Sequence, residues 1–362
     1  MRIAIVDPAS FVLPYVCFLA DACAKEGIAV DVFCSATKYN VEFVGDIERL
    51  HSGLVVVKKW AISQTAISSR IRGVFNYCRL AVDLIINRSS YDKVFFQFGI
   101  FLPVDLFIFI FIRGKLYYFV HDDVPHGFRR RIHLGTLVRS ISASRLVFVS
   151  NSVKTRFLDG YRYFRLGRKS VVLQHGVLGS RLDAPVPEFR DLDRSSVVPT
   201  CFFGNVKDYK GVDFLVEMVE AGTVGDVWIL GKWDSELAGL KIRAIVSGCV
   251  VCDEYLSVDK MEALFFKPKI YVLPYRKGSQ SGVLYLLLYF GLPFICSRTG
   301  DLYDFLKRSG LEELAFDFGD SSDFLRAHRY VVSNFVSIRR TLLEIRKTYE
   351  WANIIKYSDI VW

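Results

Sequence analysis

The stretch Tyr271–Gly300, YVLPYRKGSQSGVLYLLLYFGLPFICSRTG, constrains the fold of this chain more than any other. Its first apolar run stops at Pro274, which lacks an N–H and cannot continue a sheet ladder. A small polar loop, GSQSG at 278–282, leads into an apolar run at 283–290 that predicts a buried helix. Gly291 ends that helix and Pro293 keeps it from resuming before the next apolar run. The order is therefore strand, loop, helix, strand.

A polar loop between glycines, placed between a strand and a helix, is typical of phosphate-binding sites. The free N–H groups of the first helical turn and the positive end of the helix dipole converge there. The alternative is an ordinary strand-to-helix connection without a ligand. This stretch alone does not decide between the two.

Strands and helices alternate through both halves of the 362-residue chain, which is long enough for two domains. Alternation of this kind predicts α/β domains with mostly parallel sheets covered on both faces. Strands are expected at 2–6, 29–33, 54–57, 93–98, 116–120, 145–149 and 170–173, and then at 200–203, 227–230, 249–252, 271–273, 294–296 and 313–316. Long helices are expected at 66–87 and 322–346, with an amphipathic helix at 349–357.

The run Val94–Ile112 is the nearest approach to a membrane span. Gln97, Gly99, Pro103 and Asp105 interrupt it, and each is unfavourable in a helix that faces lipid. We therefore expect a buried strand and a core helix, with contact in the plane of a membrane left open. The chain starts on a strand rather than a signal peptide, which favours the cytoplasm.

The eight cysteines are scattered through apolar runs, which is typical of reduced thiols. Cys249 and Cys252 have the spacing of a redox or zinc pair. However, they lie in a strand-like run, and no second pair supplies the remaining ligands of a zinc site. Buried structural cysteines are the better interpretation.

Charge is divided unevenly along the chain. Residues 1–180 hold 24 Lys and Arg against 13 Asp and Glu, whereas the remainder holds 23 against 25. A basic first half favours an anionic partner. No nucleic-acid signature accompanies the charge, so anionic lipid headgroups or a lipid-linked diphosphate suit it at least as well.

The second half has another strand, loop and helix start at 202–211, FFGNVKDYKG. Open α/β sheets bind ligands at the carboxyl ends of their strands, so this loop and the loop at 278–282 are expected to meet there. Lys207 and Lys210 would neutralise a diphosphate while the second loop supplies N–H donors. The alternative is two solvated lysines near a helix start.

In the first half, FVHDDVPH at 119–126 places His121 and His126 after an apolar strand. Histidine exchanges protons near neutral pH, and a strand end fixes its position. His175 follows a later strand in the same way, and strand ends from both halves would line one inter-domain cleft. The alternative is a set of loop histidines without a role. Asp191 and Asp193 form an Asp-x-Asp in the polar linker, where carboxylates are usually solvated, so no metal site is predicted.

Several segments together resemble bacterial glycosyltransferases of the GT-B fold, in particular the family 4 enzymes that build polysaccharides. The similarity extends over nearly the whole chain and is carried by the order and spacing of the motifs. These are FVHDDVPH at 119–126, VFVSNSVK at 147–154, LQHG at 173–176, FFGNVKDYKG at 202–211, ILGKW at 229–233, LPYRKGSQSGVL at 273–284, FGLPFICSRTGDL at 290–302 and YEWANI at 349–354.

The resemblance implies two Rossmann-like domains facing across a cleft: an acceptor-binding domain at 1–178, a linker at 179–199, a nucleotide-sugar domain at 200–346 and a terminal helix at 347–362 that returns to the first domain. It implies transfer of a sugar from a nucleotide diphosphate, with UDP favoured over GDP, to a lipid-linked or glycan acceptor in surface polysaccharide synthesis. The reaction would retain the anomeric configuration without a metal or other cofactor. The enzyme would be cytoplasmic and peripheral on the inner membrane.

The resemblance also assigns roles to residues. His121 would lie against the donor sugar, His126 nearer the acceptor, and the turn at Pro8–Ser10 would face the same cleft. The second domain would hold the nucleotide diphosphate through Gly204, Asn205, Lys207, Lys210, Lys232, Ser279, Gln280, Ser281 and Gly282, with Lys210 also stabilising the leaving group.

Two positions depart from the family pattern. The family often has an arginine where this chain has Asn205, and two glutamates where it has Gly278 and Leu286. An amide cannot replace the charge of a guanidinium. The alternatives are therefore a non-catalytic binding or scaffold protein with this fold, or a sugar-nucleotide epimerase.

Overall fold

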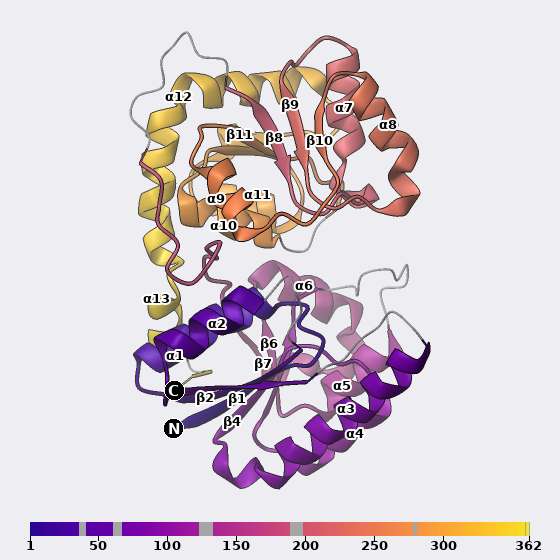
Figure 1. Cartoon of the computed structure of the whole chain (residues 1–362), viewed down its shortest axis with the longest axis vertical. Helices are drawn as coiled ribbons and strands as arrows, with labels where there is room; N and C mark the ends of the chain where they lie inside the picture. The colour runs from indigo at the N-terminus through magenta and orange to yellow at the C-terminus, as the bar shows by residue number, and fades with distance from the viewer. Residues whose placement is uncertain are drawn as a thin grey trace. The chain divides into compact units, whose positions relative to one another are not determined.

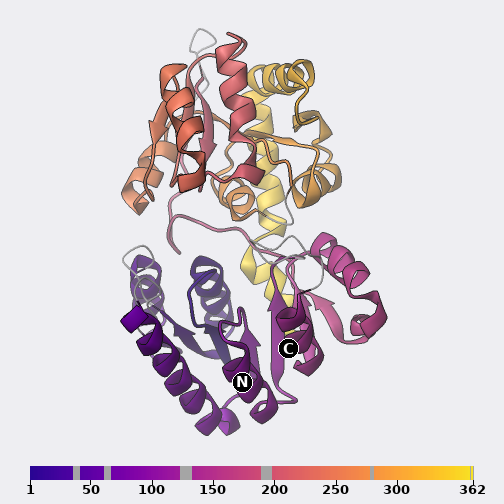
Figure 2. The ribbon, with the colours of Figure 1, turned by 90° about the vertical axis from the view of Figure 1, so that its right-hand side faces the viewer.

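The computed structural model describes residues 1–35, 41–60, 67–122, 133–188, 198–277, 281–358 and 360–361. The chain divides into two compact units. Unit 1 comprises Met1–Leu182 and Tyr349–Trp362, and unit 2 comprises Asp183–Thr348. Each unit is built around one parallel sheet with helices on both faces (Figures 1 and 2).

Unit 1 contains a seven-stranded sheet in the order β3-β2-β1-β4-β5-β6-β7. Helices α1, α2 and α13 pack together on one face, and α3, α4 and α5 pack together on the other (Figure 1). The elements are β1 (Arg2–Asp7), α1 (Leu13–Lys25), β2 (Ala29–Cys34), α2 (Val41–Leu50), β3 (Val55–Lys59), α3 (Ile67–Ile86), β4 (Lys93–Phe96), α4 (Leu102–Phe111), β5 (Leu116–Val120), α5 (Leu134–Ser142), β6 (Arg145–Phe148), α6 (Asn151–Gly160), β7 (Ser170–Val172) and α13 (Trp351–Lys356).

Unit 2 contains a six-stranded sheet in the order β10-β9-β8-β11-β12-β13. Its elements are β8 (Thr200–Phe203), α7 (Val212–Glu220), β9 (Val227–Leu230), α8 (Ala238–Val246), β10 (Val250–Cys252), α9 (Val258–Phe265), β11 (Ile270–Leu273), α10 (Gly282–Phe290), β12 (Phe294–Ser297), α11 (Gly300–Arg308), β13 (Ala315–Phe316) and α12 (Ser321–Thr348).

Both sheets reverse their strand order once, and these switch points locate the candidate sites. In unit 1 the chain adds β2 and β3 on one side of β1 and β4 on the other, and in unit 2 it adds β9 and β10 on one side of β8 and β11 on the other. Loops at the carboxyl ends of the strands diverge at such a point and leave room for a ligand.

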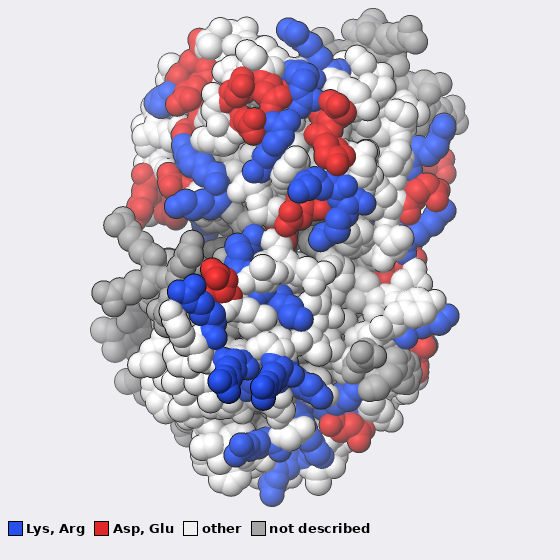
Figure 3. All heavy atoms as spheres, turned by 180° about the vertical axis from the view of Figure 1, so that it is seen from behind, with Lys and Arg blue, Asp and Glu red and all other residues white. Residues whose placement is uncertain are grey.

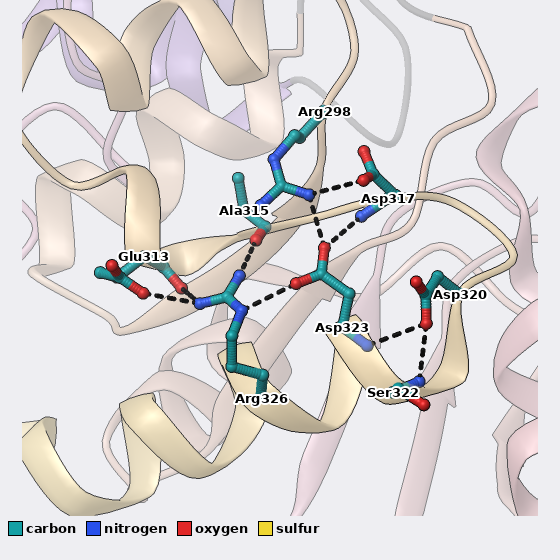
Figure 4. A network of polar contacts seen from close by, with 8 residues as sticks. All are labelled: Arg298, Glu313, Ala315, Asp317, Asp320, Ser322, Asp323 and Arg326. Carbon is teal, nitrogen blue, oxygen red and sulfur yellow. Dashed lines mark hydrogen bonds and ion pairs between the residues drawn. The ribbon is translucent and has the colours of Figure 1, made fainter.

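Helix α12 bends at Asn334, where the backbone leaves helical geometry (Figure 1). A polar network anchors its first turns (Figure 4). Asp323 accepts hydrogen bonds from Arg326 at 2.7 Å and from Arg298, the residue after β12, at 2.5 Å. Arg326 also bonds Glu313 and the carbonyl of Ala315, next to and within the edge strand β13. The network therefore ties α12 to the edge of the sheet.

One buried carboxylate of unit 1, that of Asp105, has partners on two neighbouring helices. Asp105 of α4 is fully buried and accepts hydrogen bonds from Tyr77 of α3 and from Arg139 of α5, the latter at 2.7 Å. Burial raises the pKa of Asp105, while the Arg139 guanidinium acts in the opposite direction. Because the two partners come from neighbouring helices, the carboxylate joins three helices that cover one face of the sheet.

The predicted alternation of strands and helices is confirmed, and most predicted ends agree with the structure within two residues. Helices α2, α5 and α6 were not predicted. The run Val94–Ile112 contains β4 and α4, as expected, but α4 is only partly a core helix. Its Phe107, Ile110 and Phe111 side chains are exposed, Ile110 by 67%.

The cysteines in the described parts of the chain are free thiols. Of the predicted buried pair, Cys249, just before β10, is buried, whereas Cys252, at the end of β10, is only half-buried. None of the helices within the described ranges is long and apolar enough to cross a membrane.

Candidate functional site

The first candidate site lies at the switch point of unit 2, where β8 and β11 end. Gly204 follows β8 and Ser281 precedes α10. A Cβ atom placed on Gly204 would lie 3.3 Å from Lys210 Nζ and 3.3 Å from Val283 in the first turn of α10. The structure therefore brings the β8 loop, the Lys210 ammonium and the N-terminus of α10 together, and free N–H groups there favour an anion.

Lys210 is the only one of the predicted lysines that is buried, with 9% of its surface exposed. Its Nζ lies 5.4 Å from the ring centre of Tyr275 and 5.9 Å from that of Phe202. Within the described part of the chain no carboxylate pairs with it, and burial lowers the pKa of its ammonium to about 8. A buried ammonium without an anion is unfavourable, so the surroundings of Lys210 suit a bound anionic group.

Glycine allows the loops at this edge of the sheet to meet backbone to backbone. Gly211 has φ +65°, and a Cβ atom on it would lie 2.0 Å from the Pro274 carbonyl oxygen. Gly231, after β9, has φ +142°, and a Cβ atom there would lie 2.2 Å from the Gly204 carbonyl oxygen. No other residue type fits these two contacts. The close approach joins the loops that follow β8, β9 and β11 at this edge of the sheet.

Side chains also connect the two loops. Arg276, just beyond β11, donates a main-chain hydrogen bond to the Tyr209 carbonyl at 2.8 Å and a guanidinium bond to the Asp208 carbonyl at 2.8 Å. Its other guanidinium nitrogen pairs with Asp213 in α7. Tyr275 and Ser281 share a buried hydrogen bond of 3.2 Å at the start of α10. These contacts fix the loop that carries Lys210 relative to α10.

The remaining predicted residues of this site lie in different surroundings. Asn205 and Gly282 are exposed, Lys207 is half-buried and Ser281 is buried. Lys232 is largely exposed and forms an ion pair of 3.0 Å with Asp253, whose pKa is lowered chiefly by Lys241. Ser279 and Gln280 lie outside the described residues, as does Gly278.

The second candidate site lies in unit 1, at the ends of β4 and β5. His121 follows β5 and is 6% exposed. Its Nε2 lies 2.9 Å from the Oε1 atom of Gln97, which follows β4. The ring stacks on Phe98 with centroids 5.0 Å apart, and the edge contact with Tyr15 is 5.2 Å. Burial lowers the pKa of His121 to about 3, so the imidazole is neutral at physiological pH.

His175 is buried near His121 and belongs to the same aromatic cluster. Its Nδ1 atom lies 2.6 Å from the Gly176 carbonyl oxygen, and burial lowers its pKa to about 4. Tyr15 of α1 contacts both histidines and the indole of Trp351 in α13. Trp351 in turn donates a hydrogen bond of 2.9 Å to the Val177 carbonyl. The C-terminal helix therefore packs directly against the residues that surround the histidines.

The turn at Pro8–Ser10 follows β1 at the same switch point. The fully buried Asp7 accepts main-chain hydrogen bonds from Phe11 and Val12, and Ser10, with φ 57°, exchanges hydrogen bonds with the main chain of Ser35. Burial raises the pKa of Asp7 to about 6. Hydrogen bonds with Asp7, at the end of β1, and with Ser35, just after β2, therefore fix the position of this turn. His126, the other predicted catalytic residue, lies outside the described residues.

Sequence reasoning missed three side chains that shape these sites: Tyr275, Tyr15 and Gln97. Tyr15 and Tyr275 were given no role, and Gln97 was considered only as an interruption of an apolar run. The one available signal was position, since Tyr275 closely follows the predicted strand at 271–273, whereas Gln97 was placed inside the predicted strand at 93–98, which the structure ends at Phe96. Among the described residues no three His, Cys, Asp or Glu side chains are grouped so that they could hold a metal ion.

No protein-family profile and no curated protein sequence matches the chain. Solved structures do match it along almost its full length. Sucrose-phosphate synthase from Thermosynechococcus elongatus has a TM-score of 0.69 at 14% identity, covering 98% of this chain and 96% of that one. Anabaena Alr3699/HepE, solved with UDP and glucose, has a TM-score of 0.66 at 14% identity, covering 98% and 97%.

The glycosyltransferase WaaG, involved in lipopolysaccharide biosynthesis, has a TM-score of 0.63 at 12% identity, covering 99% of both chains. A UDP-N-acetylglucosamine 2-epimerase matches as well, with a TM-score of 0.59 at 10% identity and coverage of 100% and 96%. At these identities the matches show the fold alone. The chain has the GT-B fold, with two Rossmann-like units and a final helix, α13, that belongs to unit 1.

Proposed function

We propose that the protein is a glycosyltransferase that transfers a sugar from a nucleotide diphosphate, with UDP favoured over GDP, to a lipid-linked or glycan acceptor. The observation that carries the proposal is Lys210. It is a buried ammonium without a carboxylate partner among the described residues, beside Gly204 and the N-terminus of α10. A nucleotide diphosphate supplies the missing negative charge. The fold is shared with Anabaena Alr3699/HepE, which was solved with UDP and glucose, and with a UDP-N-acetylglucosamine 2-epimerase.

In this proposal unit 2 holds the diphosphate. Gly204 and Asn205 offer the main chain of the β8 loop, and Ser281 and Gly282 offer the start of α10. Ser279 and Gln280, outside the described residues, are assigned with them to the phosphates and ribose. Negative charge grows on the leaving diphosphate as the glycosidic bond breaks. Lys210, with Lys207 and Lys232 at the margin, and the helix N-terminus stabilise that charge without a metal ion. Diphosphate binding will also raise the pKa of Lys210, because an adjacent anion favours the ammonium.

The sugar would be handled by residues of unit 1. His121 and His126 are assigned to the donor sugar and to the acceptor side, in a reaction that retains the anomeric configuration. The neutral state of His121 suits contact with hydroxyl groups, because an uncharged imidazole both donates and accepts hydrogen bonds. We place the reaction in the assembly of bacterial surface polysaccharide, at the cytoplasmic face of the membrane.

A thermal-shift panel with UDP, GDP, ADP and CMP, without added metal, tests the donor class. A nucleotide present at about 100 times its dissociation constant raises the free energy of unfolding by roughly 2.7 kcal/mol. We expect the largest shift with UDP. A shift with none of the four contradicts the proposal and favours a binding or scaffold protein that has lost chemistry, the alternative that Asn205, Gly278 and Leu286 support.

Slow hydrolysis of the donor separates the remaining alternatives. A transferase incubated with its nucleotide sugar and no acceptor should release free nucleoside diphosphate. An epimerase should instead leave a new nucleotide sugar with no free diphosphate accumulating, and a binding protein should leave the donor unchanged. Chromatography of the nucleotide products distinguishes the three outcomes.

A lipid-linked acceptor requires contact with a membrane, and unit 1 has a face that suits anionic lipid. On α3 and α4, which pack side by side, large apolar side chains are exposed: Val74, Phe75, Val82, Ile86, Phe107, Ile110 and Phe111. The exposed basic residues of the same segment are Arg72, Arg79, Arg88 and Arg113. On the face seen in Figure 3, Lys and Arg predominate over Asp and Glu on unit 1, whereas both signs are mixed on unit 2. Apolar side chains with a basic margin bind anionic membrane surfaces.

Flotation with vesicles tests this part of the proposal. At low salt the protein should float with vesicles that contain phosphatidylglycerol and less with neutral phosphatidylcholine. The variant Phe107→Ser/Ile110→Ser should lose flotation, while Ile242→Ser/Ile245→Ser, at exposed positions of α8 in unit 2, should retain it. Protein that stays in solution with both vesicle types contradicts membrane binding.

A further inference from the structure

Gln97 and His121 face each other at the ends of two paired strands. β4 and β5 pair in parallel register, with Phe96 opposite Tyr118, so the residues that follow them leave the sheet side by side. Gln97 is fully buried, and its Oε1 atom lies 2.9 Å from His121 Nε2. No other side-chain hydrogen bond to His121 is formed within the described part of the chain. The hydrogen bonding of the His121 ring among the described residues therefore depends on the Gln97 amide.

The surroundings of His121 leave it little freedom. Phe98 stacks on one side of the ring at 14° between planes, and Tyr15 meets it edge-on at 86°. His175, whose pKa is also lowered by burial, opposes a charge on His121. A neutral imidazole that is fixed in this way can still exist as two tautomers, with the proton on Nδ1 or on Nε2.

We propose that Gln97 is a positioning residue that sets this tautomer. Because the Gln97 carbonyl accepts, the proton of His121 is on Nε2, and Nδ1 presents a lone pair. This rests on the proposed function where it adds that Nδ1 accepts a hydrogen bond from a hydroxyl group of the donor sugar. The Nε2 amide group of Gln97 is buried without an acceptor among the described residues, and a second sugar oxygen would satisfy it.

The assignment of amide oxygen and nitrogen can be tested directly, because reversing the amide reverses the tautomer. Protein labelled with ¹⁵N-histidine gives long-range ¹H–¹⁵N correlations that distinguish the two forms, and His121→Gln identifies the His121 signals by their loss. We expect the Nε2–H pattern in the free protein at pH 7. An Nδ1–H pattern overturns the proposal.

Two variants at position 97 complete the test. Gln97→Leu has a similar volume and should leave His121 as a mixture of tautomers; an unchanged Nε2–H pattern overturns the proposal. Gln97→Glu places a carboxylate against the ring and should bring the His121 titration into the range of pH 5 to 8, where kcat/KM falls as the ring becomes charged. Ser140→Ala, which removes another buried polar group of unit 1, should change neither readout.

The NMR and kinetic experiments distinguish failure of the proposed role of Gln97 from failure of the proposed function. If the expected tautomers are observed but no donor binds or turns over, the proposed function is wrong and the role of Gln97 toward His121 stands. If the donor turns over in Gln97→Leu with unchanged kcat, KM and pH profile, the positioning role is overturned and the proposed function stands.

Discussion

The two units have the same doubly wound construction but surround two buried charges, Asp105 and Lys210, differently. In unit 1, Asp105 is buried with Arg139 and Tyr77 as partners, and the cluster joins three helices beside the loop between β4 and α4. In unit 2, Lys210 is buried at the strand ends without a carboxylate partner among the described residues. Removing one partner of a buried pair is destabilising, and a buried charge without a partner costs stability, so Lys210 at the strand ends suits an anionic ligand.

The residues at the strand ends of the two switch points also differ between the units. At the switch point of unit 2, glycines bring main-chain groups into contact and leave N–H donors and one cation for a ligand. At the switch point of unit 1, aromatic rings enclose two neutral histidines. The first arrangement suits a strongly anionic group and the second suits uncharged hydroxyl groups. The comparison leads to four predictions, from the largest expected effect to the smallest.

The largest effect is expected at the backbone contacts of unit 2. Gly211→Ala places a Cβ atom against the Pro274 carbonyl at a positive φ, so it should lower the free energy of unfolding by about 3 kcal/mol and weaken nucleotide binding. Gly222→Ala is the matched control, since φ is +66° there and no atom lies within 4 Å. It should lose only about 1 kcal/mol. Urea unfolding of both variants measures the difference, and equal losses would mean that the loop contact is not tight.

Lys210→Met should separate binding from stability. Losing a charge-assisted contact to a diphosphate costs about 2–3 kcal/mol, or roughly 30- to 150-fold in UDP affinity. The free variant should nevertheless unfold at a higher temperature than the wild type at pH 7. Because the folded pKa of Lys210 is depressed to about 8, the wild type should gain stability as pH rises from 8 towards 10.5, and the variant should not.

Lys269→Met is the control for that prediction. Lys269 is also buried in unit 2, but it lies at the opposite end of β11, where it contacts the Trp228 ring and the Leu264 carbonyl. Isothermal titration with UDP should give wild-type affinity. If both lysine variants bind UDP normally, Lys210 is not part of a diphosphate site.

The strands and the positions of the loops in both units could be predicted from the sequence, because they follow from the pattern of apolar residues, glycines and prolines. Apolar runs bounded by glycine and proline predicted the strands, and the Gly-flanked loops indicated the strand ends at which the candidate site of unit 2 is proposed. Helix α2, VEFVGDIERL, was missed because Gly45 interrupts a short segment that ends in charged residues. The exposed side of α4 was missed because apolar composition does not tell which residues a neighbouring helix covers.

The partners of buried groups could not be predicted. That Asp105 has two partners and Lys210 lacks a carboxylate depends on which helices and loops meet, and residue spacing along the chain does not report it. Gln97 was visible only as a polar residue in an apolar run. Its contact with His121 arises from the pairing of β4 with β5, which is a property of the sheet rather than of either segment.

The third prediction concerns the histidines of unit 1. Their folded pKa values, about 3 for His121 and about 4 for His175, lie below the unfolded value of about 6.5. The unfolded chain therefore binds protons first as pH falls below 6.5, and the free energy of unfolding decreases. Each should cost about 2 kcal/mol by pH 5. Asp7 acts in the opposite direction, because its raised pKa of about 6 favours the folded state once it is protonated.

Urea unfolding between pH 7 and pH 5 measures this acid dependence. The double variant His121→Gln/His175→Gln should lose most of it, and Asp7→Asn should make the fall steeper than in the wild type. An acid dependence that is unchanged in the double variant would mean that the two imidazoles are not held neutral, and the contrast between the two switch points would then fail.

The smallest effect is expected where charges are paired near the surface, in the network of Figure 4. Arg326→Met removes bonds to Asp323 and Glu313 at 2.7 Å each and to the Ala315 carbonyl at 2.6 Å. Because the Arg326 side chain is 39% exposed, water screens these pairs, and the free energy of unfolding should fall by about 1 kcal/mol or less. Most of that loss should vanish in 1 M salt, where exposed ion pairs are screened. Nucleotide affinity should stay at the wild-type value. A loss comparable to that of Gly211→Ala would show that charge pairing at the edge of unit 2 matters as much as the backbone contacts at its switch point.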